Sequence, residues 1–422
     1  MTTSVQKETT AHAATDRASD AYLVHKVGSQ LVANVPISVG TAFRTAAEYQ
    51  VYTSRYLENP GEDIFSDPAR VIYDSKTSMG TAFKGILLLP EYRKGNLTSR
   101  QIRDIREKEA PRMTGRMAVF LKTGEAVSVA SNLGAIYLCL EEDGSCGMKE
   151  LTTFAARTVS SGAYFVGVHF QGKGGEAMGG LQTAQTAQAQ EAVARSAYNH
   201  LNFARRTFIV MNTAEIVGGS VKVGIETYHA LTDSDQYSNA ALVDGGAHIG
   251  MGASWLAYNS YLAREAAKYV ASPATLNKGV DVLWVHARVI PPKILWSARL
   301  FGAVGPLISV GISTNDIYKG ITDDSLDAES REHKIVSGTL GIGSSLCFVG
   351  FAFFMTPASA PAGVALFAVG LSLLAVQTAY DEWGNIIDFY GRRVEPVVNP
   401  FPELYEKHLQ KTYGMIQRSP SK

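Results

Sequence analysis

The chain has 422 residues, of which 46% are hydrophobic and 18% charged, and it carries 39 basic and 39 acidic side chains. This balanced charge argues against a nucleic-acid partner, and the composition lies toward the apolar end for a soluble protein. The three cysteines lack the spacing of a zinc site or of a disulfide scaffold. A bridge between Cys139 and Cys146 is geometrically feasible, but we predict reduced thiols.

The N-terminal region, 21–180, is expected to be rich in helices behind a short tail. Residues 1–20 are polar and lack an apolar core, which predicts disorder and no signal peptide. Apolar residues then recur at helical spacing from 21 to about 57. Residues 84–122 contain ten Lys or Arg against four acidic residues. A solvated helix face is the simplest interpretation, and contact with anionic lipid headgroups is the alternative.

Three more segments of this region carry local signals. Residues 117–140 predict a core helix rather than a membrane span, because Lys122 and Glu125 interrupt the apolar run. Residues 164–170 (YFVGVHF) are short, aromatic and β-branched, so a few short strands are expected in the N-terminal half. The Gly-rich segment 171–177 loosely matches a dinucleotide-binding loop, but no βαβ alternation surrounds it. We interpret it as a flexible linker before a boundary near 180.

Residues 181–300 are interpreted as an Ala- and Gly-rich helical bundle. Long helices are expected between 185 and about 269, followed by a second helical group at 280–299. His248 has no second metal ligand three or four residues away, so a core or rim histidine is expected. The segment 301–321 is moderately apolar and rich in small residues. We expect it to pack as a third helix against the hairpin that follows it.

The segment 335–380 contains no Asp, Glu, Lys, Arg or His in 46 consecutive residues. Its two apolar arms, 335–355 and 362–380, are 21 and 19 residues long. A helical arm of that length extends about 30 Å, the thickness of the hydrocarbon core of a bilayer. Pro357 and Pro361 lie in the link between the arms, which therefore predicts a turn. The sequence thus predicts a hydrophobic helical hairpin.

The large apolar residues of the two arms are the candidates for membrane insertion. Glycine and serine residues in both arms reduce the gain from transfer into lipid, so insertion is favourable without being overwhelming. Packing in a soluble core is the alternative role of the same side chains. The nine candidates are Leu340, Phe348, Phe351, Phe353, Phe354, Leu366, Phe367, Leu371 and Leu374.

The region after the hairpin combines aromatic and basic side chains. Trp383, Tyr390, Arg392 and Arg393 are candidates for a membrane interface, although an ordinary helix end has a similar composition. Residues 393–422 are interpreted as a proline-broken connector, a short amphipathic helix and a basic tail. The expected organisation is therefore a tail (1–20), an α-rich region (21–180), a helical bundle (181–300), the hairpin region (301–392) and an amphipathic basic tail (393–422).

No motif nominates an enzyme. The sequence has no GxSxG elbow, no HExxH, no kinase signature and no set of His and Asp at metal-ligand spacing. We therefore expect a protein that is not an enzyme and that uses neither a cofactor nor a metal. The expected fold class is mainly α: a multi-helix bundle that shelters the C-terminal hydrophobic hairpin.

The charge-free hairpin, rich in Gly, Ala and Phe and accompanied by amphipathic helices, resembles the membrane-inserting domain of pore-forming colicins. It also resembles antibacterial toxins delivered by contractile secretion systems. The resemblance covers about 300–392, and 185–392 if the preceding helices form the wrapping bundle. This sequence differs from the family pattern in two ways. Forty or so residues follow the hairpin, and no receptor-binding or translocation region precedes it.

This resemblance implies a toxin that depolarises a target bacterial membrane through an ion-conducting pore. It implies the lipid bilayer, a cognate immunity protein and a component of a secretion machine as partners. The protein would be made in the cytoplasm, leave by a route independent of a signal peptide, and insert into the target membrane. Two alternatives stay open: a resident inner-membrane protein with one helical hairpin, and a soluble helical scaffold or an enzyme with an unfamiliar active site.

Overall fold

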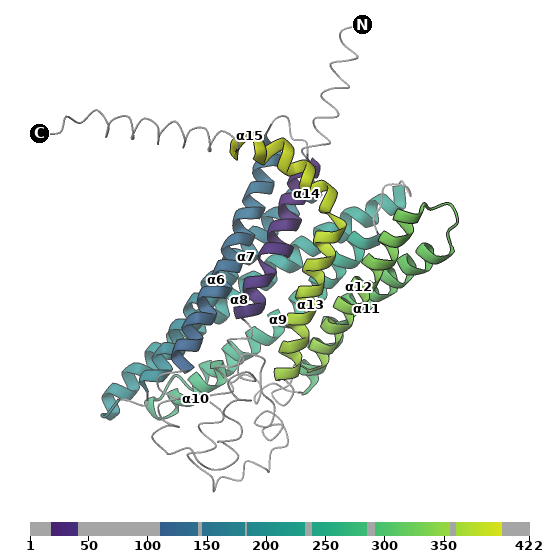
Figure 1. Ribbon diagram of the computed structural model, residues 1–422. Helices are drawn as coiled ribbons and strands as arrows, with labels where there is room; N and C mark the ends of the chain where they lie inside the picture. Colours follow the sequence, from purple (N-terminus) through teal and green to yellow (C-terminus); the bar gives the residue numbers. More distant parts are fainter. Residues whose placement is uncertain are drawn as a thin grey trace, which may run out of the picture. The chain divides into compact units, whose positions relative to one another are not determined.

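The computed structural model describes residues 18–40, 110–141, 146–181, 184–232, 239–284, 292–354 and 360–398 (Figure 1). Every regular element in these ranges is helical, which confirms the expected mainly α, multi-helix bundle. The chain divides into two compact units, 1–378 and 379–422, which are described separately. The division into five parts stays a prediction. Most of the polar tail, the basic stretch 84–109 and the end of the chain after 398 lie outside the described residues.

The first unit begins with helical residues 18–26 and 34–40 on either side of the π-helix η1 (Val27–Val32). The long helices α6 (Ala110–Leu140), α7 (Met148–Gly180), α8 (Ala187–Thr232) and α9 (Asn239–Ala267) follow. Each packs on the next in the chain, η1 packs on α6, and α10 (Pro273–Trp284) packs on both α8 and α9. The long helices expected between 185 and 269 are confirmed.

The core between α8, α9 and α10 consists of interlocking aliphatic side chains. Leu201, Leu262, Leu276 and Leu283 are fully buried there, together with small alanines that let the helices approach. A second apolar cluster joins α6 to α7 through Met117, Leu121 and Val168. The helix predicted for 117–140 is therefore confirmed, and one of its faces packs on α7.

The strand predicted for 164–170 and the linker predicted for 171–177 are both wrong, because both segments lie inside α7. Gly167, Val168 and Gln171 are buried while Phe165 and Val166 are exposed, which is the spacing of a helix face. The β propensity of YFVGVHF is overridden by packing against α8. The glycines allow that packing: a Cβ on Gly174 would lie 2.6 Å from Leu201 of α8.

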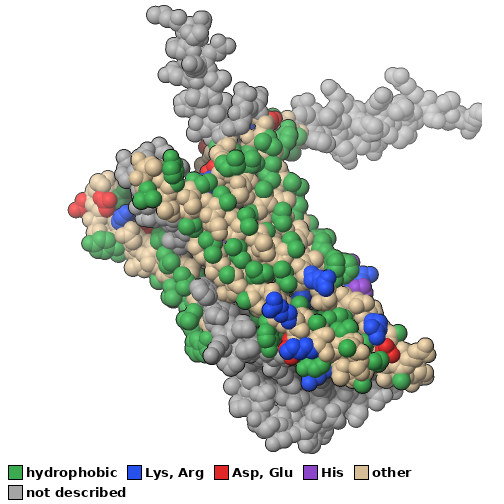
Figure 2. Space-filling model, turned by 180° about the vertical axis from the view of Figure 1, so that it is seen from behind, with side chains coloured by type: hydrophobic (Ala, Val, Ile, Leu, Met, Phe, Trp, Pro, Cys, Tyr) green, Lys and Arg blue, Asp and Glu red, His purple; other side chains and the backbone are tan. Residues whose placement is uncertain are grey.

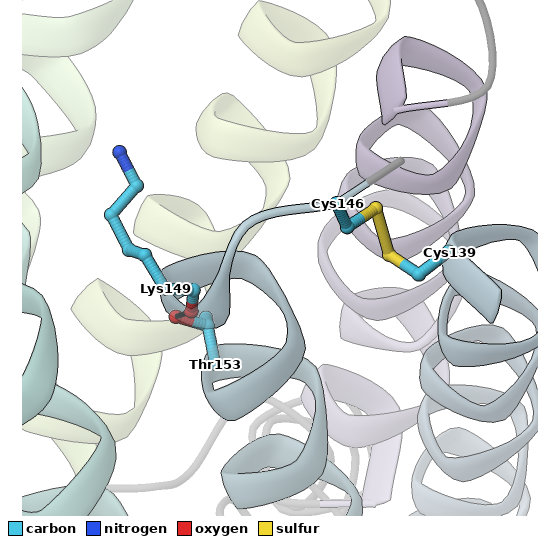
Figure 3. Close-up of a disulfide and its surroundings, with 4 residues drawn as sticks. All are labelled: Cys139, Cys146, Lys149 and Thr153. Carbon is cyan, nitrogen blue, oxygen red and sulfur yellow. Dashed lines mark hydrogen bonds between the residues drawn. A yellow bond between two sulfur atoms is a disulfide. The ribbon is translucent and has the colours of Figure 1, made fainter. Parts of the chain in front are cut away.

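The loop between α6 and α7 is closed by a disulfide between Cys139 and Cys146, so the prediction of reduced thiols is wrong (Figure 3). Their Cα atoms are 5.1 Å apart, within the range that a disulfide spans. α6 and α7 are consecutive packed helices, and their short connection brings the two cysteines together. Just after the bridge, the Thr153 hydroxyl donates to the carbonyl of Lys149 within the first turns of α7. Cys347 is a free cysteine.

The last helices of the first unit are α11 (Pro292–Thr322), α12 (Ala328–Phe354) and most of α13 (Ala360–Asp381). α11 packs on α12 and on α9, which confirms that the small-residue segment 301–321 forms a helix against the hairpin. At the contact with α9, a Cβ on Gly305 would lie 2.3 Å from the Cβ of Ala247. The two backbones are therefore as close as a glycine permits.

The described part of the second unit, up to residue 398, holds three short helical segments after the end of α13. They are α14 (Trp383–Phe389), the π-helix η5 (Tyr390–Val394) and α15 (Glu395–Val398), and each follows directly on the last. None of the residues in these three segments is buried.

Candidate membrane-inserting hairpin

The hairpin begins earlier than the sequence predicts, because α12 includes the charged turn before the apolar arm. Asp327 precedes the helix, and its carboxylate accepts a hydrogen bond of 2.7 Å from the backbone N–H of Ser330, as an N-cap does. Before it, the carboxylate of Asp323 accepts hydrogen bonds from the backbone and hydroxyl of Ser325. These bonds lower the pKa of both aspartates, so both are charged at neutral pH.

The turn between the arms is described only on its α13 side. Pro357 lies outside the described residues, and Pro361 is the second residue of α13 rather than part of a loop. A proline fits there because the first turn of a helix uses no N–H in an intrahelical bond. The connection between α12 and α13 is therefore restricted to 355–359.

α11 and α12 meet along a seam of small residues. A Cβ on Gly338 would lie 2.8 Å from the carbonyl oxygen of Ser313, and one on Gly341 would lie 2.4 Å from its hydroxyl oxygen. Farther along, the hydroxyls of Ser345 and Ser309 are 2.9 Å apart. Close contact of small residues supported by hydroxyl hydrogen bonds is a way of packing helices that works in lipid as well as in water.

α12 and α13 are joined by two hydrogen bonds and a cluster of rings. The Ser344 hydroxyl donates to the carbonyl of Gly370 at 3.0 Å, and the amide of Gln377 donates to the Ser337 hydroxyl at 3.2 Å. The ring of Phe367 lies 4.8 Å from that of Phe351 and 6.0 Å from that of Phe348. Ser344 and Gln377 thus find hydrogen-bond partners inside the hairpin.

The outward sides of the hairpin are apolar and exposed. Leu346 and Val376 are 54% and 55% exposed, and Phe353 and Val369 are exposed as well. Of the most apolar 18-residue window of α12, only 28% is buried. Among the helices that the structure describes, α11 therefore covers one side of the hairpin, and Leu346, Phe353, Val369 and Val376 lie on an exposed side.

The nine predicted insertion residues divide between the seam and the surface. Phe348, Phe351 and Phe367 form the ring cluster, Leu371 is buried, and Leu340, Leu366 and Leu374 are half-buried. Phe353 is exposed, and the side chain of Phe354 lies outside the described residues. Sequence reasoning missed Leu346, Val369 and Val376, which the structure exposes. Helical spacing could have found them, since they lie opposite the glycines and serines of the seams.

The four predicted interface residues lie in the second unit. Trp383 begins α14, Tyr390 begins η5, and both are exposed. Arg392 is exposed and its Nε donates to the carbonyl of Asp388 at 3.4 Å, while Arg393 is half-buried.

Two described helices are long and apolar enough to cross a membrane. They are the segments Ala328–Phe353 of α12 and Ala187–Tyr228 of α8, and a shorter apolar helix, Leu366–Asp381, lies in α13. The α8 segment was predicted as a helix of the bundle but not as a candidate span. Its most apolar window is only 17% buried.

A partly buried charge network joins α7, α8 and α9 at the level of Glu215. Its carboxylate contacts Arg157 at 3.2 Å and His248 at 2.7 Å, and it accepts a hydrogen bond from the Ser160 hydroxyl. His248 is thus a histidine held inside the bundle by a carboxylate, in agreement with the predicted core or rim position. Among the described residues, no group of three or more His, Cys, Asp or Glu is placed to hold a metal ion.

No protein-family model, no curated protein and no solved structure matches this chain. The fold and the hairpin therefore define the class directly: the chain is a mainly α, multi-helix bundle with two described helices long and apolar enough to cross a membrane. The more particular function is inferred from its own residues.

Proposed function

We propose that the chain is a membrane-inserting, pore-forming effector that permeabilises a target bacterial membrane through the hairpin α12–α13. The observation that carries the proposal is the exposed, uncharged outer side of both arms. An apolar surface in contact with water has a free-energy cost, and transfer into hydrocarbon removes that cost. The hairpin is long enough to place this surface across the acyl region of a bilayer.

The internal bonds of the hairpin suit a structure that exists in both solvents. Ser344 and Gln377 satisfy their hydrogen bonds within the two arms, so transfer into lipid leaves these groups paired. The seam with α11 is made of glycine and serine contacts without an ion pair. Separating α11 from α12 along these described contacts therefore breaks no ion pair.

The disulfide between Cys139 and Cys146 supports action outside the cytoplasm. Stable disulfides belong to oxidising compartments such as the bacterial periplasm, whereas cytosolic thiols are kept reduced. An effector made in the cytoplasm, exported by a secretion machine and active on the target membrane would oxidise on the way. Its producer would need a cognate immunity protein at the same membrane.

Dye release from vesicles tests the proposal. The purified chain, added without detergent to phosphatidylethanolamine–phosphatidylglycerol vesicles, is expected to release an entrapped dye. The double variant Leu346→Asp/Val376→Asp places two charges on the outer side and is expected to abolish release. The matched variant Leu346→Ala/Val376→Ala should retain it. Equal release by both variants, or none by the wild type, contradicts the proposal.

A resident membrane protein is the second candidate, and α8 favours it. A pore-forming effector needs only the hairpin to be apolar outside, yet the α8 window is even less buried than that of α12. The two candidates differ in their behaviour when expressed alone. The resident protein would sediment with membranes and require detergent, whereas the effector would be recovered in the soluble fraction.

A further inference from the structure

The outward faces of α6, α7 and α8 are formed by uncharged side chains over a length close to that of a bilayer core, and the charged side chains of this part of α7, Lys149, Glu150 and Arg157, are at most one-third exposed. In α6, the exposed residues from Val119 to Leu140 are all uncharged, and the same holds in α7 from Met148 to Val166 and, among the side chains that the structure describes, in α8 from Val210 to Leu231. At the helical rise, these stretches extend about 27–32 Å. The large apolar members are Val119, Phe120, Leu133, Leu140, Met148, Val159, Phe165, Val166, Val210, Val217 and Leu231.

The inward faces of the same stretches hold the polar and charged groups. In α8, Val210 and Val217 are 52% and 51% exposed, whereas Asn212 and Glu226 are 2% and 0% exposed. In α6, Glu125, Ser128 and Asn132 are buried. A helix on the surface of a water-soluble protein shows the opposite arrangement, with its apolar stripe turned toward the core. The outward faces of these helices are therefore suited to an apolar environment.

Several buried and half-buried polar groups between these helices are paired with one another. The ammonium of Lys149 lies 2.7 Å from the carboxylate of Glu226, and Glu215 is held between Arg157 and His248. The hydroxyls of Ser128 and Ser161 are 2.8 Å apart between α6 and α7. Ionisable side chains inside a membrane protein face the interior of the bundle and pair there, as these do.

Exposed basic residues lie at one end of this uncharged face. They are Arg116 of α6, Lys173 of α7 and Arg206 of α8. The three helices share this end, because a Cβ on Gly172 would contact Ala118 at 3.4 Å and one on Gly167 would touch Phe208. Figure 2 shows Lys and Arg gathered toward one end of a face that is otherwise largely free of charged side chains.

Exposed tyrosines lie at the opposite end. Tyr137 of α6 and Tyr228 of α8 are both 64% exposed. The disulfide and the Lys149–Glu226 pair show that the end of α6, the start of α7 and the end of α8 are neighbours. Tyrosine is enriched where membrane proteins pass from hydrocarbon to headgroups, and basic side chains bind anionic headgroups.

We infer that the outward face of α6–α8 is a lipid-contact surface that spans the hydrocarbon core of a bilayer. Arg116, Lys173 and Arg206 lie at the anionic headgroups of one leaflet, and Tyr137 and Tyr228 lie at the interface of the other. The polar network of Glu215 stays inside the bundle, away from the acyl chains. This inference goes beyond the hairpin and does not depend on it, because it uses different helices and a different set of exposed residues.

The match in length and the separation of basic and aromatic ends favour a bilayer over a protein partner. A protein interface has a polar rim around an apolar centre and does not need a fixed thickness between two such ends. Here the charge-free length on each of three adjacent helices agrees with the bilayer core. A second copy of the chain or another protein could also contact these residues. Nothing about such a contact would restrict it to a stretch as long as the bilayer core is thick.

Depth-dependent fluorescence quenching tests the surface. Cys347→Ala leaves the disulfide as the remaining cysteine pair, and single cysteines are then introduced as Leu133→Cys, Val217→Cys or Val376→Cys and labelled with bimane. Ser196→Cys is the control, because Ser196 is exposed on α8 but lies beyond Arg206, outside the uncharged stretch. The full chain is incorporated into phosphatidylethanolamine–phosphatidylglycerol vesicles with or without bromine on the middle of the acyl chains.

Labels at Leu133→Cys and Val217→Cys are expected to lose fluorescence several-fold in brominated vesicles and to be insensitive to aqueous iodide. The Ser196→Cys label should respond only to iodide. If the labels at Leu133→Cys and Val217→Cys respond to iodide alone, or to neither quencher, the surface faces water or protein and the inference is wrong. A brominated-lipid response at Val376→Cys in that same experiment would leave the proposed hairpin function intact, so the two can fail separately.

A second variant covers the case in which labelling disturbs folding. Arg116→Gln/Lys173→Gln/Arg206→Gln removes the basic end without changing the apolar face. Sedimentation with anionic vesicles is expected to fall several-fold at low salt and to change little with zwitterionic vesicles. Unchanged sedimentation with anionic vesicles contradicts the assignment of this end to headgroups.

Discussion

The hairpin α12–α13 and the three-helix face α6–α8 both present apolar side chains outward, but they treat charge differently. The apolar segment of the hairpin contains no Asp, Glu, Lys, Arg or His, whereas α6–α8 carry Glu125, Arg157, Glu215 and Glu226 at buried or half-buried positions. The hairpin can therefore leave its neighbours without exposing a charge. α6–α8 can enter lipid only as a unit, because separating them would leave a charge unpaired in hydrocarbon.

This difference explains why the two regions give different signals in the sequence. A long run without charge is visible by counting, and it identifies the hairpin. A helix with a charged inner face and an apolar outer face has an ordinary composition, and only the positions of its neighbours show which side faces out. The two regions should accordingly respond differently to substitution, and the following experiments measure that difference, beginning with the largest expected effect.

Removing the central carboxylate of the network should destabilise the α7–α9 region most. Glu215→Ala leaves Arg157 and His248 without their common partner. Because Arg157 is about one-third exposed (33%), the expected cost is about 2–3 kcal/mol, below that of a fully buried pair. Urea unfolding followed by circular dichroism measures it. Glu191→Ala, which removes an exposed pair with Arg195, is the control and should cost less than about 1 kcal/mol.

Breaking the disulfide should destabilise the end of α6 and the start of α7 without reaching the hairpin. The loss of the crosslink in Cys139→Ala/Cys146→Ala is expected to cost about 2 kcal/mol, as for a bridge that closes a short loop. Hydrogen exchange should increase around the α6–α7 connection and stay unchanged in α12. An equal increase in α12 would mean that the two regions are not independent.

Widening the seam between α11 and α12 should have a moderate effect. Gly338→Ala places a methyl group 2.8 Å from the carbonyl oxygen of Ser313, and it should destabilise the chain by about 1–2 kcal/mol. Gly311→Ala is the matched control in α11, since nothing lies within 4 Å of its added Cβ. That control should be neutral or stabilise by up to about 1 kcal/mol. Thermal unfolding of the two variants distinguishes a packed seam from a loose one.

Acid should have the smallest effect, at the start of α12. Hydrogen bonds from Ser330 and Ser325 hold the pKa of Asp327 and Asp323 below their ordinary value of 3.8. A lowered folded pKa means that this stabilisation is present at neutral pH and is lost as pH falls through the folded pKa. Amide protection in the first turn of α12 should therefore decrease only below about pH 4. Asp327→Ala should lose this amide protection already at pH 7. Asp324→Ala should keep it, because the carboxylate of Asp324 is fully exposed.

Much of the helical fold could be predicted from the sequence, because helical spacing and absence of charge are local properties. The hairpin, the helix 301–321 that packs on it and the long helices after 185 were predicted in this way. The strand at 164–170 was wrong because its composition favours a strand, while Gly167 and Gly174 give α8 a close contact that only a helix can use. The disulfide was missed because the proximity of Cys139 and Cys146 depends on how α6 returns into α7.

The candidate site was predicted in part for the same reason. Large aromatic residues such as Phe348 and Phe367 were predicted to insert into the membrane, yet they pack within the hairpin. The exposed side consists of Leu346, Phe353, Val369 and Val376. The lipid-contact surface of α6–α8 depends on which face of each helix is covered. That property arises from tertiary packing and has no local signature.

Conductance across a planar bilayer tests the central claim most directly. The wild-type chain added to one side is expected to give discrete current steps under an applied voltage, and Leu346→Ala/Val376→Ala should give the same steps. Leu346→Asp/Val376→Asp, folded as judged by circular dichroism, should give none. A silent bilayer with the wild type, or equal steps with the aspartate variant, would contradict the account.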